Sequence, residues 1–394
     1  MKLLNASRRF RFCTMLVCWV VLAETCHSDT FTPVATTAET GEACFDQWGT
    51  ETLRLIRDRF WSQKYGLYTE HALMPDGRHW RGSHPSFTWG VGVQLSALNA
   101  AARVDPKRYV NQAMAYADAI EVYWLDANGV AGFDVQPGPK EADRYYDDNA
   151  WLVLALLELF EISHERKYLD RAVATFDFVM SGKDDKLGGG LYWREQEKKT
   201  KNTCTNAPAI VSALRLHQLT HEKSYLDTAK QLYLWTGQHL QDTDGLFWDN
   251  IDLEGKIDRR KYSYNSALMI RANLLFHELS GADNYLTEAE RIANSARAAW
   301  IRDEGAVDDS GRFAHLLLEA FLALDEHHQD GSWGQVVVRS VIYLHDQVRD
   351  ADGIYGSHWI ASQRRSPRKI SLLDQASAAR IYWLAAAHFS SEAP

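Results

Sequence analysis

A block of about 58 residues recurs along the chain, and each copy contains an apolar stretch, a short polar turn and a second stretch with one apolar side. The apolar stretch 150–160 has Ala, Leu, Val, Trp or Phe at nearly every position, which predicts a helix buried on most sides. The second stretch has apolar residues three and four positions apart, which predicts an amphipathic helix with one wet face. These residues are Tyr168, Ala172, Phe176 and Val179.

The copies together predict twelve helices. Clear copies begin near residues 89, 147, 205 and 264, weaker ones follow at 313 and 374, and a single amphipathic helix at about 45–61 opens the series. A Gly–apolar–aromatic signal stands between copies, at Gly66, Gly132, Gly190, Gly245 and Gly353. Glycine is typical of helix ends, so these segments predict loops that emerge at one end of the helices.

Alternating inner and outer helices with loops at one end predict an all-α fold, the (α/α)6 barrel, which is a toroid of six helical hairpins. An open α-solenoid would show the same repeat. Six pairs without an evident polar capping repeat favour the closed barrel. Residues 41–392 contain no break in composition, which predicts one barrel domain rather than the two or three that 394 residues allow.

The N-terminus has the pattern of a secretory signal peptide. Basic residues at positions 2, 8, 9 and 11 precede an apolar run at 12–23, which is too short to cross a bilayer as a helix. We predict a signal peptide at 1–23 and a flexible leader at 24–40, and hence a secreted protein that is extracellular or periplasmic. Cleavage would leave Cys26, Cys44 and Cys204, which allow one disulfide or isolated buried thiols and have no zinc-site spacing.

Composition narrows the function classes. Acidic residues outnumber basic ones by 52 to 43, which argues against broad nucleic-acid binding because phosphates require a basic face. The chain contains 14 Trp, 17 Tyr and 15 Phe, an excess that fits either a large core or a carbohydrate groove. The sequence has no HExxH, GxSxG or P-loop motif. We expect no metal, no cofactor, no membrane span and a monomer.

The candidate chemistry is a pair of adjacent acids, Asp147 and Asp148, between two tyrosines and the apolar run of an inner helix. Helix capping explains one carboxylate at a helix start, but a second beside it in aromatic surroundings suffers repulsion and indicates function. Two carboxyls there can flank one sugar carbon at about 5 to 5.5 Å, the separation of a retaining glycosidase. The acids at 184–185 and 308–309 and the basic run 198–201 are predicted to lie in solvated loops, with Lys201 nearest the cleft.

Four strings in combination resemble glycoside hydrolase family 76, which contains bacterial α-1,6-mannanases and is related to fungal cell-wall proteins. They are 146–151, 188–193, 201–208 and 262–265. The resemblance covers about 41–390 and implies an (α/α)6 barrel that hydrolyses α-1,6-linked mannose backbones with retention. It implies that Asp147 is the nucleophile and Asp148 the acid/base. The chain departs from many members at Leu152 and Ala209, where bulkier aromatics would shape flanking subsites.

Further substrate contacts are expected at the same end of the barrel. The repeat register places two asparagines at inner-helix starts, where they would bond sugar hydroxyls or cap their helices. These are Asn206 and Asn265. Four aromatic residues are candidate stacking platforms for sugar rings, with core packing as the alternative. These are Tyr146, Trp193, Trp248 and Tyr264.

The sequence therefore predicts a secreted, retaining endo-α-1,6-mannanase that uses two aspartates on a mannan polysaccharide. One alternative is another (α/α)6 enzyme: a transglycosylase acting on cell-wall glycan, an epimerase or a glucuronyl hydrolase. Epimerases of this shape use histidine pairs at inner-helix ends, whereas this chain carries Asp and Asn there. A second alternative is a glycan-binding barrel without catalysis, which the intact aspartate pair disfavours.

Overall fold

The computed structural model describes residues 44–72, 84–138, 140–328, 330–363 and 369–390, all within the unit Ala43–Pro394. This part of the chain contains twelve α-helices, as predicted. The inner six are α2 (Thr88–Val104), α4 (Tyr146–Ser163), α6 (Thr203–Thr220), α8 (Ser263–Ser280), α10 (Gly311–Asp325) and α12 (Leu372–Ser390). The outer six are α1 (Phe45–Phe60), α3 (Pro106–Ala119), α5 (Arg166–Met180), α7 (Lys223–Leu240), α9 (Asp283–Trp300) and α11 (Ser332–Tyr343).

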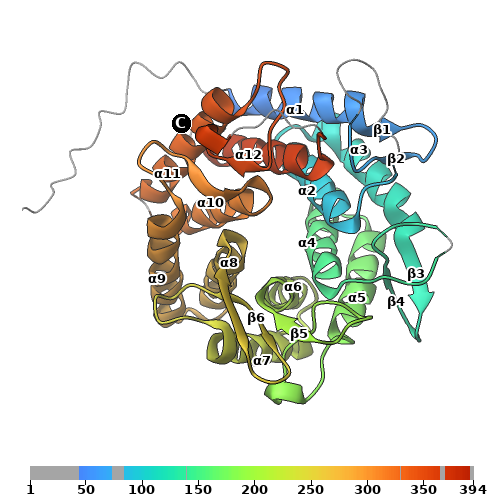
Figure 1. Ribbon diagram of the computed structural model, residues 1–394, viewed down its shortest axis with the longest axis vertical. Coiled ribbons are helices and arrows are strands. Elements are labelled where there is room, and N and C mark those ends of the chain that lie inside the picture. Colours follow the sequence, from blue (N-terminus) through green and yellow to red (C-terminus); the bar gives the residue numbers. More distant parts are fainter. Residues whose placement is uncertain (1–43, 73–83, 139, 329, 364–368, 391–394) are drawn as a thin grey trace, which may run out of the picture. The chain divides into compact units, whose positions relative to one another are not determined.

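The inner helices form a closed ring. Each packs against the next in chain order, and α12 packs against α2, so that the last inner helix meets the first (Figure 1). The opening helix α1 packs against the last helix, α12, and the two form the sixth helix pair of the ring. The fold is therefore the predicted (α/α)6 barrel, and the open α-solenoid is excluded.

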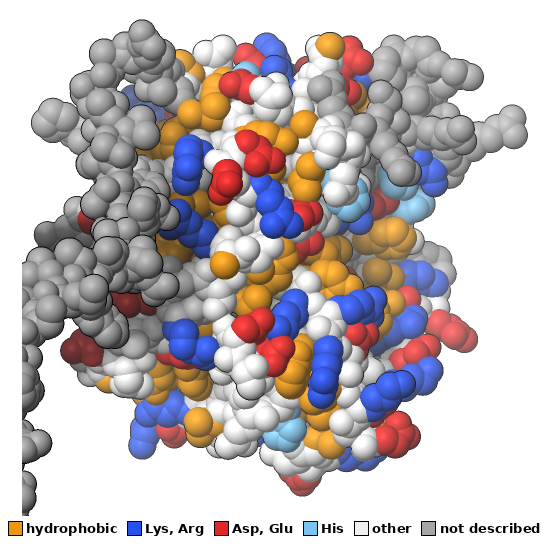
Figure 2. Space-filling view, turned by 60° about the vertical axis from the view of Figure 1, so that its left-hand side comes forward, with side chains coloured by type: hydrophobic (Ala, Val, Ile, Leu, Met, Phe, Trp, Pro, Cys, Tyr) orange, Lys and Arg blue, Asp and Glu red, His pale blue; other side chains and the backbone are white. Residues whose placement is uncertain are grey.

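Burial follows the predicted difference between the two kinds of helix. In the amphipathic helix α5, the side chains predicted to face inward are all buried: Tyr168, Ala172, Phe176 and Val179. Polar side chains cover the outside of the ring, and Figure 2 shows basic and acidic groups interleaved on the side where α9 and α11 lie in Figure 1. Apolar inner helices and half-polar outer helices thus place one hydrophobic core between the two rings.

Short antiparallel strands lie where the chain returns from an outer helix to the next inner one. They are β1 (Trp61–Ser62), β2 (Leu67–Tyr68), β3 (Trp124–Ala127), β4 (Val130–Phe133), β5 (Thr200–Asn202), β6 (Trp248–Asp252), β7 (Ile257–Lys261), β8 (Val307–Ser310) and β9 (His358–Trp359). The pairs are β1–β2, β3–β4 and β8–β9, and β5–β6–β7 form a three-stranded sheet. The sheet was not predicted, because β5 and β6 are separated by two helices in the sequence.

The Gly–apolar–aromatic signals mark these returns, and the structure shows how four of the five are held. A polar side chain in the first turn of an inner helix bonds the backbone of the apolar or aromatic residue in the preceding return. Asn149 clamps Phe133 at both its N–H and C=O, and Gln375 clamps Tyr355 in the same way. At Gly190, φ is +75° and a Cβ would lie 2.6 Å from the Trp235 ring, so that only glycine fits there.

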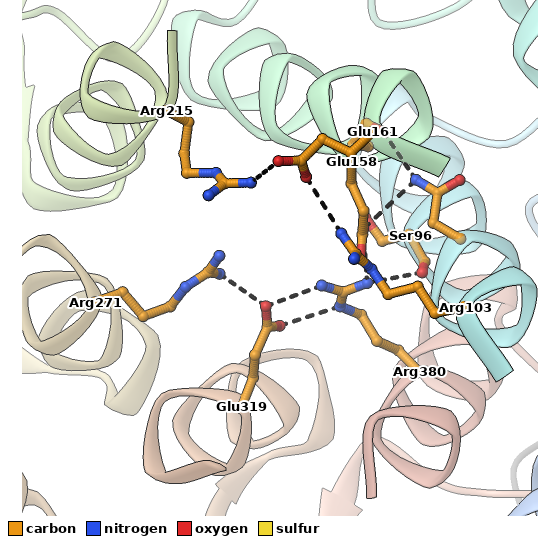
Figure 3. A network of polar contacts seen from close by, with 10 residues as sticks. Ser96, Arg103, Glu158, Glu161, Arg215, Arg271, Glu319 and Arg380 are labelled. Carbon is orange, nitrogen blue, oxygen red and sulfur yellow. Dashed lines mark hydrogen bonds and ion pairs between the residues drawn. The ribbon is translucent and has the colours of Figure 1, made fainter. Parts of the chain in front are cut away.

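The other end of the barrel is closed by a belt of ion pairs, defined here as Arg103, Glu158, Glu161, Arg215, Arg271, Glu319 and Arg380 (Figure 3). Arg380 lies at its centre, 2.9 Å from Glu319 and 3.2 Å from Glu158. Arg271 reaches the same Glu319 oxygen at 2.9 Å. With the bond from Arg380 to the Ser96 carbonyl, the belt connects all six inner helices.

The predicted signal peptide 1–23 and leader 24–40 lie outside the described residues. Among the helices that the structure describes, none combines the length and the apolar character that a membrane crossing requires.

Candidate active site

Asp147 and Asp148 lie in the first turn of α4, at the end of the barrel where the inner helices begin. The residue before the helix, Tyr145, has an extended backbone, and Asn149 bonds its carbonyl at 2.8 Å. The Tyr146 N–H donates to the Trp193 carbonyl at 2.9 Å. The start of α4 is therefore fixed both to the β4 return and to the loop that carries Trp193.

Asp147 is bound through one of its two carboxyl oxygens. The indole Nε1 of Trp193 donates to Asp147 Oδ2 at 2.8 Å, and the Sγ of Cys204 lies 3.5 Å from the same oxygen. Burial raises the pKa of Asp147 to about 6, while the Trp193 bond, helix-start amides and the thiol oppose that rise. The other oxygen, Oδ1, is buried and has no hydrogen-bond partner within the described residues.

Asp148 has the stronger tendency to keep its proton. Burial raises its pKa well above the usual range, and the charges of Asp147 and Asp143 raise it further. At near-neutral pH the pair therefore favours one ionised carboxyl, on Asp147, and one protonated carboxyl, on Asp148. These are the states that a nucleophile and a general acid require.

A cavity of about 540 Å³ opens at this end of the barrel, and both aspartates line it. Two exposed aromatic side chains stand among its lining residues, Phe87 at 41% and Trp193 at 40% exposure. Polar lining comes from the β5–β6–β7 sheet and includes Asn202, Asp249 and Arg260. A hollow with aromatic and hydrogen-bonding walls fits a carbohydrate, whose rings have both apolar faces and hydroxyl edges.

Four aromatic side chains from four inner helices line the deep part of this cavity. Trp89 stacks on Phe313 with ring centroids 5.7 Å apart, and Phe313 stacks on Tyr264 at 4.3 Å. Trp151 continues the series, 6.4 Å from Tyr264. Trp89 and Trp151 also line a second cavity of about 370 Å³ that contains the ion-pair belt. This aromatic layer therefore lies between the two cavities.

The structure brings four of the predicted site residues together at the cavity: Asp147, Asp148, Trp193 and Tyr264. The other four lie elsewhere. Tyr146 is buried against Phe178, and Asn206 clamps Leu191 and the Asn202 carbonyl as Asn149 clamps the β4 return. Core packing, the alternative for Tyr146, describes its surroundings, whereas Asn206 anchors a loop, which was neither of the two roles expected for it.

Trp248 and Asn265 are also displaced from the cavity lining. The Trp248 indole donates to Asp242 at 3.2 Å, and Arg259 covers its ring. Asn265 is buried within α8, one residue beyond Tyr264. Adjacent helical side chains point about 100° apart, and of these two neighbours it is Tyr264 that lines the cavity. We leave all four residues out of the proposed substrate contacts.

Several loop predictions need correction. Lys201 is fully buried and donates to Asp184 Oδ1 and the Lys186 carbonyl, both at 2.7 Å, so it is a clamp within the loop rather than a solvated residue. Asp309 accepts from the Ser263 N–H at 2.8 Å and thereby caps α8. Leu152 and Ala209, expected to shape subsites, are fully buried in the core.

Sequence reasoning missed several residues that line the cavity. Cys204, expected to form a disulfide or to be an isolated buried thiol, is a buried free thiol, but its position beside Asp147 was not predicted. Asp249 sits on β6, accepts from the Asn250 amide at 2.9 Å and has its pKa raised by burial. The only signal for Asp249 was its place directly after a Gly–apolar–aromatic segment. In the part of the chain that the structure describes, no group of three or more metal-binding side chains is arranged to hold an ion.

Residues 54–326, more than half of the chain, match the sequence model of glycosyl hydrolase family 76. The chain belongs to this family. A GH76 α-mannanase from Bacteroides thetaiotaomicron is 27% identical, with a TM-score of 0.83 over 89% of this chain and 97% of that chain. The expected family and fold are therefore confirmed.

Two further relatives are more distant. Mannan endo-1,6-α-mannosidase DCW1 of Saccharomyces cerevisiae is 25% identical over 168 residues, which are 38% of this chain and 37% of that protein. The match thus spans little more than a third of this curated relative. An inactive variant of the α-1,6-mannanase of Salegentibacter sp. HEL1_6, with two consecutive aspartates changed to asparagine and α-1,6-mannotriose bound, is 22% identical. It has a TM-score of 0.74 over 87% of this chain and 99% of that chain, and shares the fold.

Proposed function

We propose that the protein is a retaining endo-α-1,6-mannanase that cleaves α-1,6-linked mannan backbones. The observation that carries the proposal is the pair of carboxyls in the first turn of α4, which line one cavity and differ in their tendency to ionise. The α-mannanase name of the 27%-identical relative and the endo-mannosidase name of the yeast relative support the substrate class.

In the proposed first step, the Asp147 carboxylate attacks the anomeric carbon and forms a glycosyl–enzyme ester. The glycosidic C–O bond breaks, and the leaving oxygen takes the proton of Asp148. In the second step, the Asp148 carboxylate removes a proton from water, and the resulting hydroxide displaces Asp147 from the anomeric carbon. Two displacements at one carbon return the α configuration to the product. The loss of activity when two consecutive aspartates are replaced in the Salegentibacter enzyme supports this assignment.

The cavity walls suggest how the sugar chain is held. Phe87 and Trp193 are exposed enough to stack on sugar rings at the rim, and Tyr264 lies deeper. Asn202 and Asp249 offer hydrogen bonds to hydroxyl groups. We also propose that the protein is exported, since mannans of this kind are extracellular polymers and the apolar run at 12–23 is typical of a signal peptide.

The test is incubation of the purified protein with linear α-1,6-mannan and α-1,6-mannooligosaccharides, with chain length followed by chromatography. Release of short oligomers, with the new reducing end initially α by proton NMR, is expected. Asp147→Asn and Asp148→Asn should each lower the rate by at least about a thousandfold, because neither displacement proceeds without both groups. Asp308→Asn is the matched control, since Asp308 also belongs to an adjacent acid pair but lies outside the cavity lining.

Three results would contradict the proposal. An initial β product would exclude retention, and full activity in either asparagine variant would exclude the assigned pair. Binding of mannan without any change in chain length would support a glycan-binding barrel instead. Products longer than the substrate would identify transglycosylation, in which a sugar hydroxyl replaces water in the second step.

A further inference from the structure

Cys204 lies in the first turn of α6, the inner helix next to α4, and its side chain is only 5% exposed. Its Sγ is 3.5 Å from Asp147 Oδ2, within reach of an S–H···O hydrogen bond. Burial raises the pKa of the thiol well above its usual range, and the charge of Asp147 raises it further. The sulfur therefore keeps its hydrogen and acts as a donor to the carboxylate.

The two oxygens of Asp147 have different surroundings. Oδ2 receives two donors, the Trp193 indole at 2.8 Å and the Cys204 thiol, whereas Oδ1 has no partner among the described residues. Two donors on one oxygen fix the rotation of the carboxyl group about its last torsion. The carboxylate is thus held by Oδ2, while Oδ1 is buried beside the start of α4.

Both donors stand on backbone that is itself fixed. The buried Asn206 side chain accepts from the Leu191 N–H at 2.9 Å and donates to the Asn202 carbonyl at 2.8 Å. It therefore ties the loop that leads to Trp193 to the start of the helix that carries Cys204. The Trp193 carbonyl is in turn bonded by the Tyr146 N–H, next to Asp147. The donors and their acceptor form one rigid unit.

We propose that Cys204 is a positioning residue: its thiol, together with Trp193, holds the carboxylate of Asp147 in one rotation at the wall of the cavity. The inference rests on the proposed mannanase function for its catalytic consequence. The hydrogen bond itself, which favours the ionised form of Asp147, is present in the free protein and can be tested without any substrate. A thiol is a weak donor that is large enough to fill the space between α4, α6 and α8, and it constrains the nucleophile without masking its charge.

The groups that face this unit determine the pH behaviour. Asp148 and Tyr145 face it from α4 and its N-terminal flank, and Tyr264 from α8 lines the same cavity beside Cys204. Asp249 on β6 and Arg260 on β7 line the same cavity. None of these groups donates a hydrogen bond to Asp147 Oδ2, whose donors are Trp193 and Cys204. Removing the thiol should therefore raise the pKa of Asp147, since a donor to the carboxylate favours its charged form.

The experiment compares wild type with Cys204→Ala, Cys204→Ser and the control Thr205→Ala, which removes a buried hydroxyl from the next residue of α6. The first measurement is kcat and KM on α-1,6-mannooligosaccharides against pH. Cys204→Ala should lower kcat about fivefold and move the acidic limb of kcat/KM upward by about half a pH unit, with little change in KM. Cys204→Ser should keep kcat and the acidic limb close to their wild-type values, because its hydroxyl can still donate to Asp147. Thr205→Ala should show neither the lower kcat nor the shifted limb.

The second measurement needs no activity. The side-chain carboxyl ¹³C resonance of Asp147, assigned by its loss in Asp147→Asn, is titrated in the intact proteins and should show the same upward shift in Cys204→Ala. An unchanged resonance and an unchanged acidic limb would overturn the inference. A lower kcat without either shift, not restored by serine, would also overturn it and assign Cys204 to packing alone. If wild type cleaves no mannan, the proposed function fails, and the titration still decides whether the thiol binds Asp147.

Discussion

Replacing Asp147 by asparagine should make the protein more stable at neutral pH while it removes activity. Asp147 is half-buried at the barrel mouth, and the loss of water around its carboxyl raises its pKa from 3.8 to about 6. The folded protein therefore holds a proton that the unfolded chain releases between these two values. Its stability falls as the pH rises through this window. Asparagine has no charge to desolvate, and its amide oxygen can still accept from the Trp193 indole.

The magnitude follows from the two pKa values. Each pH unit between them costs about 1.4 kcal/mol, so a rise from 3.8 to about 6 amounts to about 3 kcal/mol of unfolding free energy once Asp147 is ionised in both states. Well below pH 3.8 the carboxyl is protonated in both states and the difference disappears, and at pH 4 only about 0.5 kcal/mol of it remains. For a domain of this size, about 3 kcal/mol corresponds to a rise in Tm of about 4 °C.

The assay is thermal unfolding of wild type and Asp147→Asn, followed by circular dichroism at pH 4 and at pH 7.5. The gain in Tm should be near zero at the lower pH and close to its full value at the higher one. Asp308→Asn, which changes an acid outside the cavity lining, should show no such pH-dependent gain. A variant that is less stable than wild type at pH 7.5, or equally altered at both pH values, would refute the reasoning.

Three further predictions concern the pair and its supports. The kcat/KM profile on mannooligosaccharides should be bell-shaped, with an acidic limb near pH 6 from Asp147 and a basic limb at higher pH from Asp148; a flat profile across pH 5 to 9 would contradict the assignment. Arg380→Met should lower the unfolding free energy by about 3 kcal/mol in denaturant titrations, because it removes the central cation of the ion-pair belt and leaves Glu319 and Glu158 with only their outer arginine partners. The exposed Arg291→Met is its control and should cost less than about 1 kcal/mol. Lys201→Met should cost about 2 to 4 kcal/mol and reduce activity, because it frees the loop that carries Trp193; unchanged stability would show that the clamp is not needed.

The sequence by itself determined the architecture. A repeat of apolar and amphipathic stretches dictates paired helices, since burying both kinds of face requires an inner and an outer ring. Adjacent acids at the start of one apolar run also indicated which end of the barrel carries the cavity that they line, because charges are stable there only at a helix terminus open to solvent. These inferences depend on patterns within a few turns of chain, which local physical chemistry controls.

Only the tertiary structure decided which polar and aromatic side chains face the cavity. Tyr146 and Trp193 looked alike in sequence, yet packing buries the first against Phe178 and exposes the second at the rim. Cys204 carried no signal, since its contact with Asp147 joins residues 57 positions apart on neighbouring helices. Side-chain direction on a helix changes by about 100° per residue, so the rotation of each helix against its neighbours decides which residues meet. That rotation is set by the whole ring and not by any one segment.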